Sequence, residues 1–94
     1  MRSYIRVAWL HSFPDEPCLL YSEIDIERRE IRKVEEFPNG CLGFACAETS
    51  SPKTKLGEEP IPPLVEIAAD PQFSPVEITK AQFEAIWDKA TSRM

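Results

Sequence analysis

The sequence contains a single histidine, three cysteines and only three glycines. His11 has no cysteine or second histidine nearby, so a zinc-type ligand set is not predicted. Cys18, Cys41 and Cys46 are odd in number and lack C-x-x-C spacing, which disfavours both a disulfide framework and a metal site. We therefore expect reduced thiols, no bound metal and no cofactor.

Basic residues are outnumbered by acidic ones, and the N-terminus has no long apolar run. Eleven Lys and Arg against sixteen Asp and Glu give a formal charge of −5. Binding to phosphate needs clustered basic side chains, so the sequence disfavours nucleic acid as a ligand and is compatible with a basic protein partner. The N-terminus alternates polar and apolar residues, so we expect no signal peptide and no membrane span. These features favour a cytoplasmic protein.

The length of 94 residues leaves room for one domain with one modest core. We expect a single domain over residues 1–94, with a sheet over 3–48 and a Pro-rich loop over 49–63 that carries four of the nine prolines. A short helical turn over 64–69 and a C-terminal helix over 79–91 are expected to follow.

Two strands are predicted before residue 25. Ser3–Leu10 alternates with apolar side chains on one face, which is typical of a half-buried strand. His11–Pro17 contains two prolines and must turn, and we expect Phe13 to fold back onto the core. Cys18–Ile24 is rich in strand-forming residues and should pair antiparallel with the first strand.

A hairpin is predicted around Asn39-Gly40, and we take it as the centre of the sheet. Asn-Gly between apolar-bearing runs favours a type I′ turn, in which both residues have positive φ. The preceding segment is ambiguous, because spacing by three would also fit a helix from Asp25 to Phe37. We favour a strand over Glu30–Phe37, with a bulge, because the segment leads directly into the turn.

The return strand is predicted over Leu42–Glu48. Its small residues Gly43, Ala45 and Ala47 share one face and leave room for another element to pack closely. The predicted fold is therefore α+β: a four-stranded antiparallel meander with a Pro-rich loop and a C-terminal helix packed on one face.

The C-terminal helix has the clearest local signals. Thr79 and Gln82 fit a capping box, and Phe83, Ile86 and Trp87 recur at helical spacing. This apolar stripe should cover the sheet, and we expect Trp87 in the core, as we do Trp9 of the first strand.

Charged residues of alternating sign surround the predicted second and third strands. They fit either a solvated face with cross-strand ion pairs or a protein-docking surface. On the docking interpretation, the predicted partner-binding residues are Glu16, Glu23, Asp25, Arg28, Arg32 and Glu35.

A different class of function also fits. A small enzyme or ligand-binding module would use a polar site built from His11, Asp15, Glu16, Tyr21 and Arg28. Cys41, directly after the turn, is the candidate for a reactive thiol, although free cysteines commonly serve only as packing residues.

Motifs along nearly the whole chain resemble a small bacterial family described only as a domain of unknown function. The residues that carry the resemblance are Tyr4-Ile5-Arg6-Val7, Trp9, His11, Asp15-Glu16-Pro17, Leu20-Tyr21-Ser22-Glu23-Ile24-Asp25, Arg32-Lys33-Val34-Glu35, Asn39-Gly40, Pro60-Ile61-Pro62-Pro63, Asp70-Pro71, Phe73 and Trp87.

The resemblance implies a non-enzymatic immunity protein, because some members look like proteins that neutralise polymorphic toxins by blocking their active sites. The implied partner is a cognate toxin domain, and no catalytic residue is implied. A fold does not determine a function. The expectation of an immunity protein therefore also depends on the acidic charge of this chain and on the six predicted contact residues.

Overall fold

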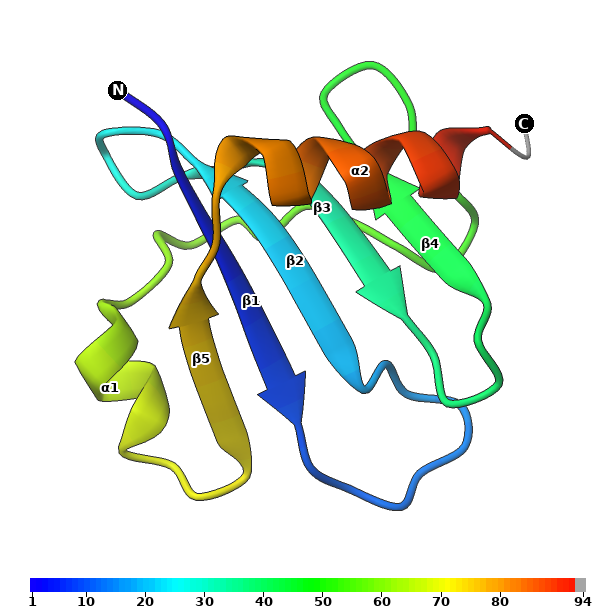
Figure 1. Ribbon diagram of the computed structural model, residues 1–94, viewed down its shortest axis with the longest axis horizontal. Helices are drawn as coiled ribbons and strands as arrows, with labels where there is room; N and C mark the ends of the chain where they lie inside the picture. Colours follow the sequence, from blue (N-terminus) through cyan, green and yellow to red (C-terminus); the bar gives the residue numbers. More distant parts are fainter. Residues whose placement is uncertain (93–94) are drawn as a thin grey trace.

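The computed structural model describes residues 1–92, so the last two residues of the predicted 1–94 domain lie outside the described residues. The described chain is α+β, as predicted, with one antiparallel sheet (Figure 1). Its elements are β1 (Ser3–Trp9), β2 (Leu19–Ile24), β3 (Glu30–Glu36), β4 (Leu42–Ala45), α1 (Leu64–Ala68), β5 (Phe73–Glu77) and α2 (Lys80–Thr91).

The sheet has five strands in the order β4-β3-β2-β1-β5. The predicted meander of β1 to β4 is present, but four strands is wrong, because β5 pairs antiparallel with β1. Pro71 and Pro75 had indicated a turn, yet an edge strand tolerates proline because one side of its backbone has no partner strand. The β3–β4 hairpin correspondingly lies at one edge of the sheet and β2 lies at its centre.

The ambiguous segment over residues 25–37 forms a strand. Instead of capping a helix, the Asp25 carboxylate accepts the backbone N–H groups of Glu27 and Arg29, both at 2.9 Å, and closes a turn. The register against β2 then shifts by one residue, so that Glu30 and Arg32 pair with β2 and Ile31 is the extra residue. A β-bulge is therefore present, and it lies at Ile31.

The β3–β4 turn lies where predicted but is of a different type. The Phe37 carbonyl accepts the Gly40 N–H at 2.8 Å, and Gly40 has φ of 87°. Within residues 1–92 the only non-glycine residue with positive φ is Arg28, so Asn39 is not in a type I′ turn. Pro38 favours the first central position of a type I turn, and Gly40 then supplies the left-handed residue of a three-residue hairpin loop.

Helix α2 crosses the front of the sheet in Figure 1 and covers its upper half. Its predicted capping box is present, since Thr79 Oγ1 accepts the Gln82 N–H and Gln82 Oε1 accepts the Thr79 N–H. Phe83 is fully buried, and its ring lies tilted against that of Tyr4, with ring centroids 5.5 Å apart. Between the sheet and α2, Val34, Phe44 and Ala90 form a buried cluster, with Tyr21, Leu42, Ile86 and Trp87 packed around it.

The connection from residue 46 to residue 63 crosses the back of the sheet on its way to α1 (Figure 1). Thr54 in this connection is 1% exposed, and a Cβ on Gly43 would lie 2.1 Å from its hydroxyl. The small-residue face of β4 therefore allows close packing. Strand β4 ends at Ala45, before the predicted Glu48, because the chain turns back and Ser50 pairs with Ala45.

Two predicted core aromatics lie elsewhere. Phe13 is 59% exposed and does not fold onto the core. It stacks instead on His11, with ring centroids 5.4 Å apart. Trp9 is half-buried on the back of the sheet, with its ring 4.3 Å from that of His11, so it lies outside the core beneath α2.

Candidate functional site

Two of the predicted contact residues, Glu23 and Arg32, lie on the face of the sheet that α2 covers, where Glu23 is buried and Arg32 is part-buried. Glu23 is 5% exposed, and its carboxylate accepts the Tyr4 hydroxyl at 3.1 Å and Arg32 Nε at 2.5 Å. Tyr4, Glu23 and Arg32 are directly opposite one another on β1, β2 and β3, so the sheet register itself brings them together. Burial, followed by the bond to Glu23, raises the pKa of Tyr4.

Arg32 also ties the sheet to α2. Its guanidinium donates to both carboxylate oxygens of Glu84, at 3.1 and 2.6 Å, which lowers the pKa of Glu84. The same group lies 4.9 Å from the centroid of the Phe83 ring and 5.0 Å from that of Trp87. The acidic and basic residues at this position are therefore engaged in holding the fold together.

Arg28 and Asp25 organise the β2–β3 turn. Arg28 donates from Nε to the Ile61 carbonyl at 2.8 Å and from Nη2 to the Pro62 carbonyl at 2.7 Å. Its own carbonyl accepts the Ile61 N–H at 2.7 Å. A non-glycine residue with φ of 66° is uncommon, and here that conformation aims the side chain at the connection it fastens.

The last two predicted contact residues, Glu16 and Glu35, line one groove on the back of the sheet. We call this the acidic groove, and its central part has a volume of about 340 Å³. The residues lining that part are Trp9, Asp15, Glu16, Pro17, Leu20, Glu35, Phe37 and Lys53.

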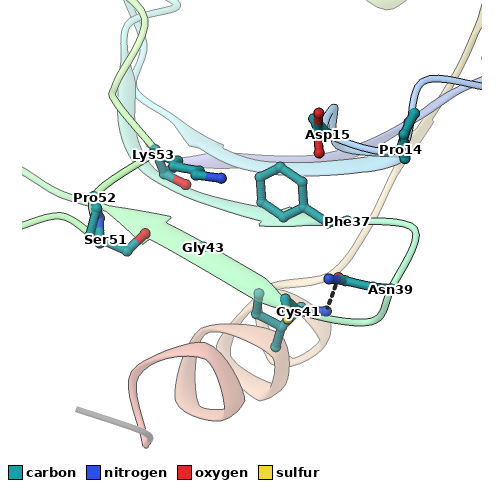
Figure 2. A pocket seen from close by; sticks show the side chains of 11 residues that line it. Pro14, Asp15, Phe37, Asn39, Cys41, Gly43, Ser51, Pro52 and Lys53 are labelled. Carbon is teal, nitrogen blue, oxygen red and sulfur yellow. Dashed lines mark hydrogen bonds between the residues drawn. The ribbon is translucent and has the colours of Figure 1, made fainter.

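The groove continues in both directions through shared residues. Towards the β3–β4 hairpin it passes Phe37, Asp15 and Lys53 into a hollow of about 350 Å³ floored by Gly43 (Figure 2). Figure 2 shows the Phe37 ring between Asp15 on one side and Lys53 on the other. In the other direction Trp9, Asp15 and Glu16 lead to the exposed ring of Phe13.

The β1–β2 loop holds Asp15 and Glu16 beside the sheet, and His11 fixes that loop. Its Nδ1 accepts the Phe13 N–H at 2.9 Å, so Nε2 carries the proton and donates to the Pro17 carbonyl at 2.8 Å. Both ring nitrogens are thereby committed to the loop backbone. His11 acts as a positioning residue for the acidic groove.

The groove is acidic and partly apolar. Asp15, Glu16 and Glu35 outnumber Lys53 among its charged groups. Glu35 accepts the Thr54 hydroxyl at 3.0 Å, and burial raises its pKa despite the opposing effects of Thr54 and Lys33. The rings of Trp9 and Phe37 line the same groove as these carboxylates, which is an arrangement suited to an organic cation.

The structure does not assemble the alternative polar site. His11 and Glu16 precede the start of β2, whereas Arg28 follows its end, and six residues of strand span roughly 20 Å. Tyr21 lies on the opposite face of the sheet, facing α2. Cys41 is exposed at the hairpin, where its N–H donates to Asn39 Oδ1 at 2.9 Å (Figure 2).

The sequence pattern predicted Trp9 in the core and did not mark Phe37 as a site residue. The signal in the sequence was that Trp9 ends a strand and Phe37 directly follows one, each next to a proline-containing turn, which places a large ring at the rim of the sheet. Within residues 1–92, no group of three or more His, Cys, Asp or Glu side chains could hold a metal ion. No helix in that range is long and apolar enough to cross a membrane.

A family model described as "Domain of unknown function (DUF6881)" matches residues 3–92, which confirms the resemblance to a family of that description. Neither curated proteins nor solved structures give a match.

Proposed function

The chain belongs to the DUF6881 family of domains of unknown function, and from that premise we propose that it is a non-enzymatic immunity protein. It binds a basic surface of a cognate toxin domain in the acidic groove and blocks that domain. The resemblance described above motivates the class of partner. The observation that carries the proposal is the grouping of three carboxylates around two aromatic rings in one concave surface.

This grouping suits lysine or arginine side chains of a protein. Charge-assisted hydrogen bonds to Asp15 and Glu16 would orient the incoming cation, and the faces of Trp9 and Phe37 would attract it further. Lys53 restricts the fit, because a basic residue placed against it would be repelled. Such a pattern of opposite charges favours one register of the partner over others and increases the association rate.

Exposed apolar side chains of the β1–β2 loop could also anchor a partner. Leu10 is 64% exposed and Phe13 is 59% exposed, and both belong to the same loop as Asp15. A stable interface buries about 800 Å² on each partner, which is more than a single groove supplies. We therefore propose that the β1–β2 loop and the β3–β4 hairpin complete the binding surface on either side.

Of the six predicted contact residues, Glu16 and Glu35 carry this proposal. Charge reversal at Glu23 would test folding, because its carboxylate is buried against Arg32. The acidic net charge makes nucleic acid a poor ligand. We propose that the protein acts in the cytoplasm, where its three free cysteines would stay reduced.

The experiment that tests the function is affinity capture from the native host with the tagged protein as bait. The proposal predicts one stoichiometric protein, encoded beside this gene, whose isolated domain arrests bacterial growth. Co-expression of the immunity protein should restore growth. Capture of no stoichiometric partner by folded bait, or growth arrest that co-expression does not relieve, would contradict the proposal.

A further inference from the structure

A second cavity lies on the back of the sheet, between the strands and the segment that leads into α1. Its volume is about 360 Å³, which is within the roughly 300–1,000 Å³ of small-molecule sites. Apolar side chains from β1, β2, β5, α1 and the connection form most of its wall: Ile5, Val7, Leu20, Ile61, Ile67 and Phe73. We call it the back-face cavity, and it shares only Leu20 with the central part of the acidic groove.

The charged residues in the wall of this cavity neutralise each other. Glu30 accepts the Ser22 hydroxyl at 2.6 Å and the Gly57 N–H at 2.7 Å, and Lys33 Nζ lies 3.2 Å from it. Lys33 also donates to the Lys55 carbonyl at 3.0 Å. The Glu30 side chain is 1% exposed and that of Lys33 is 15% exposed. This pair therefore presents no net charge to a ligand in the cavity.

The remaining charges at the cavity are both negative. Glu66 and Asp70, from α1 and the residues just after it, are exposed and line the same cavity. Among the described lining residues, Lys33 is the only base, and it is already paired with Glu30. A ligand with an apolar body and a positively charged head would match both the wall and this pair of carboxylates.

We propose that the back-face cavity binds small apolar amines, with the alkyl or aryl body against Val7, Leu20 and Phe73 and the ammonium group at Glu66 and Asp70. Helix α1, which forms one side of the cavity, has five residues and none of them is buried.

The test compares three ligands that share one chain and differ only in the head group: octylamine, 1-octanol and octanoate. Titration of the isotope-labelled protein, followed by amide chemical shifts at low ionic strength, gives each Kd. Octylamine should bind at least tenfold more tightly than octanoate, with octanol between them, and shifts should centre on β1, β5 and α1. Equal affinities, tighter binding of octanoate, or no shifts at these elements would overturn the proposal.

Two double variants, both at exposed residues, test where the head group binds without changing the hydrophobic core. Glu66→Gln with Asp70→Asn should remove the preference for the amine and leave octanol binding unchanged. Asp70→Asn keeps the Oδ1 atom that accepts the Gln72 N–H at 2.9 Å. The matched control, Asp15→Asn with Glu16→Gln, should keep the preference. Loss of the preference only in this control would place the amine in the acidic groove and overturn the assignment.

Discussion

Arg32 on β3 and Glu84 on α2 face each other through two parallel hydrogen bonds, while the third donor of the same guanidinium binds the buried carboxylate of Glu23. One arginine thus connects the centre of the sheet to the helix that covers it. Because a planar guanidinium presents several donors in a fixed geometry, lysine cannot reproduce this arrangement.

Arg32→Ala should therefore destabilise the protein strongly. It leaves Glu23 charged, buried and without its main partner, so we expect the free energy of unfolding to fall by about 3 kcal/mol. Glu84→Gln should cost less, about 0.5 to 1 kcal/mol, because the Glu84 side chain is 35% exposed and solvent screens the pair. Chemical denaturation measures both, and equal losses would contradict this account.

Close packing at Gly43 gives a second prediction. A methyl group there would meet the Thr54 hydroxyl at 2.1 Å, and Thr54 is too buried to move aside. Gly43→Ala should lower the free energy of unfolding by about 1–3 kcal/mol. Gly57→Ala is the matched control, since its Cβ would come no closer than 3.4 Å to Glu30. A similar loss in both variants would remove the role assigned to the Thr54 contact.

The clamp formed by Arg28 should govern the mobility of the connection. Arg28→Gly accommodates the positive φ but removes both side-chain bonds to Ile61 and Pro62. We expect amide hydrogen exchange in residues 55–63 to accelerate at least tenfold, with β2 unchanged. Arg29→Gly, which loses one bond to the Glu58 carbonyl, is the comparison variant. Unchanged exchange in Arg28→Gly would show that the connection is held by other contacts.

The pH dependence of stability should carry opposite contributions from two glutamates. Burial raises the pKa of Glu35 above its ordinary 4.5, so the folded state binds this proton more tightly and stability falls as pH rises through the folded pKa. Arg32 lowers the pKa of Glu84. The contribution of Glu84 to stability is therefore present above pH 4.5 and is lost as pH falls through the folded-state pKa.

Unfolding curves of Glu35→Gln and Glu84→Gln across the acid range measure these contributions. Relative to wild type, Glu35→Gln should gain stability as pH rises from below 4.5 to neutrality. Glu84→Gln should lose stability relative to wild type over the same rise. Parallel curves for the two variants would contradict the assigned causes.

Local signals in the sequence predicted local structure well. The capping box at Thr79 and the hairpin before Leu42 depend on neighbouring residues, so both could be located from the sequence. The predicted turn type was wrong because Pro38 changes which residues occupy the turn. Strand β5 was not predicted because Pro71 and Pro75 indicated a turn, although the segment pairs with β1. That pairing depends on a distant strand, which the local pattern does not contain.

The candidate site was less predictable for the same reason. Glu23 and Arg32 were predicted to contact a partner, but the register places them beside Tyr4 on the face of the sheet that α2 covers. Glu16 and Glu35 are far apart in sequence and meet only because the β1–β2 loop folds beside the back of β3. The composition thus predicted an acidic surface, and the topology determined which acidic residues form it.

The most direct measurement of the central claim is the affinity of the captured toxin domain for two charge-reversed variants, determined by titration calorimetry. Asp15→Lys with Glu16→Lys reverses the acidic groove. Glu58→Lys with Glu59→Lys makes the same change in charge at exposed residues of the connection. The account predicts at least tenfold weaker binding, about 1.4 kcal/mol, for the groove variant and an affinity near wild type for the control. Wild-type affinity in the groove variant, or equal weakening in both, would contradict it.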